Sequence, residues 1–200
     1  MTNDNTLNYA NKVCAFTGYR PQKLNACLSR GTLTVQDIEL ILRRQMLTLL
    51  DEGFNTFMSG MAIGADLIFA RIALELQREY TPKLARLVAV IPCLEHDKNW
   101  GERDRIHCRE LSESAYETVV VSNSCYFDGC MAKRNHYLVD RCDELIAVYD
   151  GQRGGTMQTI NYAKGKRRKV TIIDPSKELI ITLRESYETS KTIQEYLFAE

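Results

Sequence analysis

The sequence has no excess of charge of either sign, because 26 Lys and Arg residues balance 26 Asp and Glu residues. A neutral chain produces no overall field that attracts nucleic acid or an anionic lipid surface. The basic run at residues 164–169 follows a predicted helix, where cations complement the helix dipole. It contains no aromatic side chain on which a base could stack, so it favours a solvated helix end over a nucleic-acid patch.

Long apolar runs are also missing. No run approaches the roughly 18 residues needed to cross a membrane. Residues 1–11 are polar and lack the apolar segment of a secretory signal peptide. These two absences predict a cytoplasmic protein that has no membrane partner.

Closely paired cysteines are absent as well. The seven cysteines are an odd number scattered along the chain, and no Cys-x-x-Cys pair occurs. Structural zinc sites usually draw on such tight spacings, so we expect no metal, although Cys and His residues recur between positions 93 and 142. We interpret the cysteines as reduced thiols, and the composition identifies no cofactor.

Short apolar segments alternate with helical patterns along the chain. The predicted strands span residues 13–17, 54–58, 86–91, 118–121, 144–148 and 170–173. Strands that alternate with helices predict a parallel sheet covered on both faces. With no internal repeat or linker, residues 1–200 are expected to form a single doubly wound, Rossmann-like α/β domain with a six-stranded, mainly parallel sheet. Its core would span about residues 12–175, and residues 176–200 would form a helical tail.

The segment 149–156, YDGQRGGT, follows the predicted strand 144–148 and precedes a helical pattern. The N-terminus of a helix presents free backbone N–H groups, and its dipole favours an anion. Glycines let a phosphate approach the backbone, and the Thr156 hydroxyl could cap the helix or bond the anion. The alternative interpretation is a turn that only begins a helix.

A second glycine turn, SGMAIGAD at residues 59–66, follows the predicted strand 54–58. In an open parallel sheet the ligand lies beyond the carboxyl ends of the strands, where the strand order reverses. Two such turns favour a ligand that contains phosphate. The predicted ligand-binding residues are Gly18, Tyr19, Arg20, Ser59, Gly60, Gly64, Asp66, Arg134, Asn135, Asp150, Gly151, Gly154, Gly155 and Thr156.

Four of these side chains have alternative roles. Arg134 suits bidentate phosphate binding or a salt bridge on a helix surface. Asp66 would be a favourable charge in the first turn of a helix or an acceptor for a ribose hydroxyl. Arg20 could contact phosphate or stack on a base, and Asn135 could bond a base or ribose or remain a polar surface residue.

The motifs FTGYRP (16–21), SGMAIGAD (59–66), KRN (133–135) and AVYDGQRGGT (147–156) together resemble the YpsA-like family. That family belongs to the SLOG superfamily of Rossmann-like domains, with the DNA-processing protein DprA and the cytokinin-activating LOG enzymes. The resemblance covers about residues 12–175. It implies a domain that binds a nucleotide or a derivative such as an ADP-ribose or NAD relative, and it suggests a homodimer.

The resemblance to LOG enzymes is partial. Their Met-x-x-Arg-Lys element corresponds to MAKRN at residues 131–135, where Asn135 replaces the lysine. Their Gly-Gly-x-Gly-Thr-x-x-Glu loop is shortened to GGTMQT, so Thr159 stands where LOG enzymes carry the catalytic glutamate. We expect the Thr159 hydroxyl to bond a backbone carbonyl one turn back. Asp66, Asp128 or Asp150 would have to supply a replacement acid.

The resemblance therefore implies a non-catalytic sensor or regulator that binds a small, nucleotide-like ligand. The alternative is a LOG-like hydrolase that cleaves an N-glycosidic or phosphate bond of a nucleotide. A DprA-like DNA-binding module is a weaker alternative, which the neutral net charge disfavours.

Overall fold

The computed structural model describes residues 11–81, 83–184, 187–192 and 194–195. The strands are β1 (Lys12–Thr17), β2 (Phe54–Ser59), β3 (Arg86–Ile91), β4 (Glu117–Val120), β5 (Glu144–Val148), β6 (Lys169–Asp174), β7 (Leu179–Arg184) and β8 (Tyr187–Thr192). The helices are α1 (Pro21–Leu28), α2 (Val35–Asp51), α3 (Ala65–Tyr80), α4 (Glu102–Ser114), α5 (Cys130–Arg141) and α6 (Gly155–Gly165). Within these residues, no helix is both long and apolar enough to cross a membrane.

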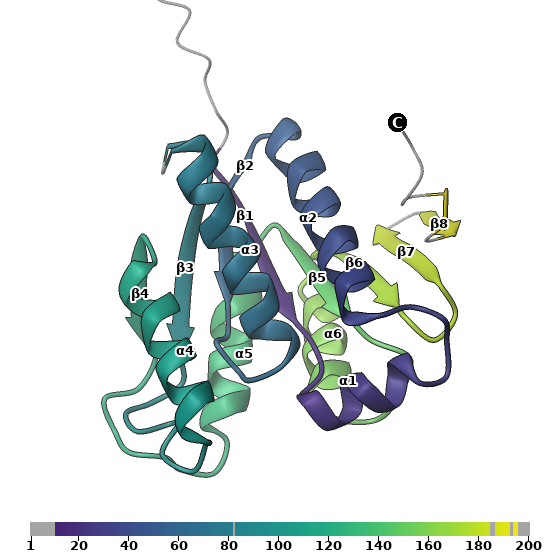
Figure 1. Ribbon diagram of the computed structural model, residues 1–200. Helices are drawn as coiled ribbons and strands as arrows, with labels where there is room; N and C mark the ends of the chain where they lie inside the picture. Colours follow the sequence, from purple (N-terminus) through teal and green to yellow (C-terminus); the bar gives the residue numbers. More distant parts are fainter. Residues whose placement is uncertain (1–10, 82, 185–186, 193, 196–200) are drawn as a thin grey trace, which may run out of the picture.

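All eight strands form one sheet, in the order β4-β3-β2-β1-β5-β6-β7-β8 (Figure 1). Neighbours from β4 to β6 pair in parallel, whereas β7 and β8 are antiparallel additions at one edge. From β1 the chain first builds the sheet toward β4 and then returns to place β5 on the other side of β1. The strand order therefore reverses between β1 and β5, which is where this class of fold binds ligands.

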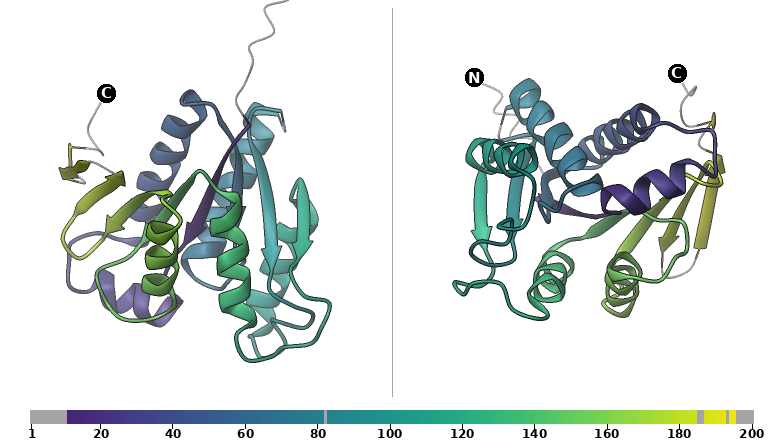
Figure 2. Two further views of the ribbon diagram at one scale, coloured as in Figure 1. Left: turned by 180° about the vertical axis from the view of Figure 1, so that it is seen from behind. Right: turned by 60° about the horizontal axis from the view of Figure 1, so that its bottom comes forward.

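The helices form two layers, with α1 to α4 on one face of the sheet and α5 and α6 on the other (Figure 2). Successive side chains of each central strand point alternately toward the two helix layers. Phe16 faces the first layer, where its ring stacks on Phe69 of α3 with 4.6 Å between centroids. Ala15, next to it, packs in the second cluster with Leu138 of α5 and Ile160 of α6. The doubly wound, Rossmann-like α/β fold expected from the sequence is confirmed.

The end of the chain differs from the helical tail expected for residues 176–200. Residues 179–184 and 187–192 form the β7–β8 hairpin, so the sheet has eight strands and not six. The apolar residues among positions 179–183 fit helical spacing, but they include the β-branched pair Ile180 and Ile181. Strand β7 pairs with β6 from Val170 to Asp174 and supplies hydrogen-bond partners for what would otherwise be an exposed sheet edge. The positions 196–200 of the expected tail lie outside the described residues.

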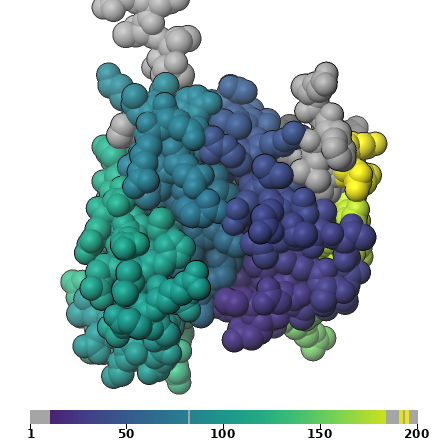
Figure 3. All heavy atoms as spheres, in the orientation of Figure 1, coloured from purple at the N-terminus to yellow at the C-terminus, as the bar shows by residue number. Residues whose placement is uncertain are grey.

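The chain that leaves β1 forms the short helix α1. Proline at the first position of a helix loses no intrahelical hydrogen bond, and Pro21 occupies that position in α1. This short helix carries Leu24 and Cys27 into the core. In Figure 3 the purple surface of α1 and the teal surface around α4 border the lower edge of the molecule, at the carboxyl ends of the strands.

Candidate phosphate and nucleotide site

A cavity of about 260 Å³ lies beyond the carboxyl ends of β1 and β5. The loop after β1 and the N-termini of α1, α3, α5 and α6 contribute to its wall. The lining residues are Thr17, Gly18, Tyr19, Arg20, Lys23, Ala62, Asp66, Met131, Arg134, Asn135, Gly154, Gly155 and Thr156. They carry three cationic side chains against one carboxylate, which gives the cavity a net formal charge of +2.

The N-terminus of α6 opens onto this cavity. Gly154 is the N-cap residue, and no side chain caps the helix. The first N–H groups of a helix lack intrahelical partners, so this end offers donors and a positive dipole to an anion. A Cβ atom at Gly155 would meet no heavy atom within 4 Å, which shows that the space in front of the helix is open. The Thr156 hydroxyl does not cap the helix. It donates to the Gly18 carbonyl at 3.2 Å and so joins α6 to the loop after β1.

A buried ion pair forms one wall of the cavity. Arg134 reaches from α5, and its Nη1 donates to Asp66 Oδ2 of α3 at 3.2 Å. Both residues are 5% exposed. The guanidinium lies against Gly60, where any Cβ would come within 1.2 Å of Nη1. Only glycine at this position therefore leaves room for the arginine.

The ion pair leaves part of Arg134 without a partner. Among the described residues its buried Nε finds no hydrogen-bond acceptor. Burial lowers the pKa of Arg134, and it raises the pKa of Asp66 against the opposing charges of Arg134 and Arg20. For both residues the free-energy cost of desolvation thus exceeds the favourable interaction between the two charges, as is common for buried ion pairs. A second negative group beside Arg134 would offset part of that cost.

Two further cations complete the wall. Arg20 is the N-cap residue of α1, and its guanidinium carbon lies 5.6 Å from the centroid of the Trp100 ring. Lys23, in the first turn of α1, donates from Nζ to the Arg153 carbonyl at 2.9 Å. The sequence interpretation missed Lys23, although Pro21 as a helix-start signal would have placed it in a first turn.

Nine of the predicted ligand-binding residues line the cavity: Gly18, Tyr19, Arg20, Asp66, Arg134, Asn135, Gly154, Gly155 and Thr156. The structure does not place the other five in its lining: Ser59, Gly60, Gly64, Asp150 and Gly151. These five shape the turns around it.

Two of these supporting residues illustrate how they act. Ser59 Oγ donates to the Asp66 carbonyl at 2.8 Å and accepts from the Met61 N–H at 3.2 Å. Gly64, at φ +100°, lets α3 approach the loop after β1 closely, since a Cβ there would lie 2.5 Å from the Tyr19 carbonyl oxygen. Side chains larger than hydrogen would push the two loops apart.

Asp150 also acts from behind the cavity. Its side chain is 2% exposed and accepts hydrogen bonds from the Tyr19 hydroxyl and the Arg30 guanidinium. Burial by itself would raise the pKa of Asp150, but these partners outweigh burial and lower it. The charged carboxylate joins the loop after β5 to the loop after β1, and so holds the two sides of the cavity together.

The hydroxyl of Thr159 is fully engaged. It donates to the Gly155 carbonyl at 2.8 Å, the bond one turn back that the sequence predicts. It also accepts from Asn135 Nδ2 at 2.8 Å, and the residue is only 2% exposed. Asn135 therefore links α5 to α6 at the cavity wall.

Asp66 supplies the one carboxylate among the lining residues of this cavity.

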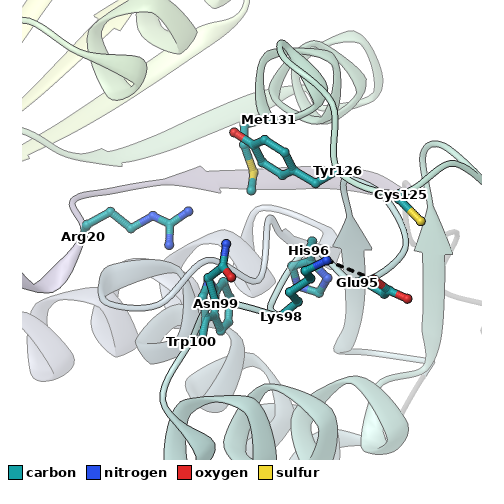
Figure 4. Close-up of a pocket in the computed structure, with 9 residues that line it drawn as sticks. All are labelled: Arg20, Glu95, His96, Lys98, Asn99, Trp100, Cys125, Tyr126 and Met131. Carbon is teal, nitrogen blue, oxygen red and sulfur yellow. Dashed lines mark ion pairs between the residues drawn. The ribbon is translucent and has the colours of Figure 1, made fainter.

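A second, larger cavity of about 510 Å³ adjoins the first and shares Arg20 and Met131 with it (Figure 4). Its other lining residues are Glu95, His96, Lys98, Asn99, Trp100, Cys125 and Tyr126. The sequence interpretation overlooked this cavity. The sequence feature that could have indicated this cavity is Trp100, a lone tryptophan in a polar loop that follows a buried strand. Across the part of the chain that the structure describes, no cluster of three or more Cys, His, Asp or Glu side chains could hold a metal.

The family model described as the YspA SLOG family (YpsA) matches residues 14–188. This protein belongs to the YpsA family. A YpsA-family relative from Bacillus subtilis, the UPF0398 protein YpsA, is 26% identical over 159 residues, which cover 79% of this chain and 87% of the relative. A UPF0398 protein from Bacillus cereus is 28% identical over 160 residues, covering 80% of this chain and 85% of the relative.

Two solved structures share the fold of this YpsA-family protein. The DNA processing protein A (DprA) of Streptococcus pneumoniae superposes with a TM-score of 0.54 at 18% identity, over 81% of this chain and 50% of that chain. DprA of Helicobacter pylori, described for its binding of single-stranded DNA, gives a TM-score of 0.51 at 17% identity. That match covers 80% of this chain and 64% of the other. At such identities the likeness establishes the fold alone.

Proposed function

We propose that this protein binds a small, nucleotide-like ligand whose phosphate occupies the smaller cavity, and that it acts as a sensor or regulator. The observation that carries the proposal is Arg134, a buried guanidinium that lines the cavity and whose Nε has no acceptor among the described residues. Buried polar groups normally have partners, so a buried guanidinium that lines a cavity with one carboxylate as its ion-pair partner points to a further, anionic ligand. A phosphate beside the guanidinium would supply that charge.

The surroundings of Arg134 suit a phosphate. Arg20 and Lys23 add positive charge, and the open N-terminus of α6 adds backbone donors. The planar guanidinium matches the geometry of a phosphate and can donate two hydrogen bonds to it. Under this proposal Arg20, Arg134, Gly154 and Gly155 contact the phosphate, and the other lining residues surround it.

Binding without catalysis is the better fit to these side chains. Cleavage of an N-glycosidic bond normally depends on a carboxylate that stabilises an oxocarbenium-like centre or activates water. Thr159 cannot provide that charge, and Asp66 is already paired with Arg134. Of the three acids named from the sequence, Asp150 and Asp128 are absent from the lining of the cavity. The alternative is a LOG-like hydrolase, and an assay for release of free base from a nucleotide distinguishes it from a protein that only binds.

Single-stranded DNA is the second candidate ligand, because a protein that shares this fold, DprA of Helicobacter pylori, is described as binding it. Such binding relies on a positively charged groove that follows the strand and is strongly salt-dependent. The formal net charge of this chain is zero. We therefore favour a small ligand and include an oligonucleotide in the test.

Calorimetric titration of the purified protein tests the proposal. The ligands are inorganic phosphate, ribose 5-phosphate, AMP, ADP-ribose and a single-stranded oligonucleotide. Arg134→Lys keeps the charge but loses the planar fork, so its affinity for the phosphorylated compounds should fall by about tenfold, or about 1.4 kcal/mol.

Arg43→Lys is the matched control, since Arg43 is half-buried and pairs with Glu75 and Glu79 on α3, far from the cavity. It should bind as the wild type does. Thermal unfolding of both variants verifies that they fold. The proposal fails if no phosphorylated compound binds, or if Arg134→Lys and Arg43→Lys bind equally well. Salt-sensitive binding of the oligonucleotide alone would favour the DNA candidate.

A further inference from the structure

The larger cavity is a slot with two facing walls. One wall comes from the loop after β3 and the other from the loop before α5 together with its first turn. Figure 4 shows Tyr126 and Met131 on one side, Asn99, Trp100 and His96 on the other, and Arg20 at one end. An ion pair between Lys98 and Glu95, 3.9 Å apart, lies toward the opposite end.

A backbone hydrogen bond joins the two walls, and ring contacts hold the side chains of one wall in place. The Leu94 N–H donates to the Ser124 carbonyl at 3.0 Å and thereby joins the two loops. The His96 ring packs edge-on against Trp100 with 5.3 Å between centroids, and Arg20 lies over the same indole. The slot is thus formed before any ligand arrives.

Two aromatic side chains line this slot, and one of them is mostly exposed. Tyr126 is 59% exposed, although it is large and partly apolar. Its ring borders the same cavity as the half-buried Trp100, which comes from the other wall. Flat rings on such walls are typical of sites that stack a base, because every base presents a π-face.

The size of the two cavities indicates that one ligand fills both. Pockets for small ligands usually measure about 300–1,000 Å³. The phosphate cavity, at about 260 Å³, is small for a whole nucleotide, whereas the slot beside it measures about 510 Å³. The two meet at Arg20 and Met131. A phosphate at α6 and a ring in the slot would be joined by a sugar that passes these two side chains.

We propose that this slot holds the base of the ligand. The proposal rests on the proposed function and adds the place of the base. Asn99 lies at the slot with an amide that can both donate to and accept from the edge of a base. Tyr126 and Trp100 supply the stacking surfaces.

Trp100 is the only tryptophan of the chain, so its fluorescence reports on the slot directly. Titration with AMP should quench it, after correction for absorption by the base. Ribose 5-phosphate, which has no base, should bind in the calorimeter and leave the fluorescence unchanged. AMP should also bind more tightly than ribose 5-phosphate.

Tyr126→Ala tests the stacking wall at little risk to folding, because the ring is mostly exposed. Loss of one stacking partner should weaken AMP by about tenfold and leave ribose 5-phosphate unchanged. Tyr80→Ala is the control: Tyr80 is 40% exposed and ends α3 at the opposite end of the sheet from the cavities. Its affinities should equal those of the wild type.

The outcomes separate this inference from the proposed function. If AMP binds no more tightly than ribose 5-phosphate, or if Tyr126→Ala weakens both ligands equally, the slot is not the base site and phosphate binding still stands. If neither AMP nor ribose 5-phosphate binds, the phosphate site itself is wrong.

Discussion

Gly155→Asp places a carboxylate where we expect the phosphate. The position tolerates it: a Cβ at Gly155 meets no heavy atom within 4 Å, and the residue is not in the left-handed region that favours glycine. It is also the first residue of α6, where a negative side chain stabilises a helix by about 0.3–1 kcal/mol. The free energy of unfolding should therefore stay the same or rise.

The effect on binding should have the opposite sign. Two unit charges 4 Å apart interact by about 4 kcal/mol at the effective dielectric constant of a protein surface. Solvent in the open cavity and salt will screen part of this repulsion. We expect a loss of about 2 kcal/mol or more, which is a fall in AMP affinity of about thirtyfold.

Two variants serve as controls in the same calorimetric titration with AMP. Gly155→Ala adds bulk without charge and should keep nearly full affinity. Gly165→Asp adds the same charge at the other end of α6, where a Cβ also meets open space, and should leave binding unchanged. Denaturant unfolding of all three variants gives the stability side of the comparison.

Three results would contradict the reasoning. Unchanged AMP affinity in a folded Gly155→Asp protein would remove the N-terminus of α6 from the site. An equal loss in Gly155→Ala would show that space, and not charge, controls binding there. A lower stability of Gly155→Asp would contradict the predicted effect of the helix dipole.

The remaining predictions concern catalysis and acid stability. Incubation with AMP should release no free adenine, measured by chromatography; release well above that of Gly155→Asp would overturn this, and Asp66 would be the first carboxylate to replace. Asp150→Asn should lower the free energy of unfolding at neutral pH by about 1.5–3 kcal/mol, because it loses charged hydrogen bonds with Tyr19 and Arg30. The pKa of Asp150 is lowered on folding, so its contribution is present above about pH 4 and is lost as the pH falls through the folded pKa. Denaturant unfolding across this range should show a shallower acid decline in Asp150→Asn, and an equal decline in both proteins would contradict the role of the carboxylate.

Much of the fold could be predicted from the sequence because it depends on local burial. All five residues of β5 are buried, and the four that follow Glu144 form the continuous apolar run typical of a strand covered on both faces. The turns before α3 and α6 were also local signals, since Gly64 and Gly154 have φ angles that favour glycine. These features place the loops at the correct edge of the sheet.

The end of the chain could not be assigned in this way. Residues 179–183 are apolar at nearly every position, and both a helix and a strand can bury part of such a run. The open edge of β6 decided between them, because pairing with Val170 to Asp174 satisfies backbone groups that a docked helix would leave exposed. That edge exists only in the assembled sheet.

The sequence alone determined the fold class, the glycine turns and the loops that carry the polar residues, because periodicity and backbone conformation are properties of neighbouring residues. Tertiary structure alone decided what each side chain does. Asp66 meets Arg134 across 68 residues, and Tyr19 meets Asp150 across 131. Both pairs depend on the reversal of strand order between β1 and β5, which the packing of the whole sheet sets. For that reason Asp66 lies at the cavity wall while Asp150 supports the wall from behind, although both were predicted to bind the ligand.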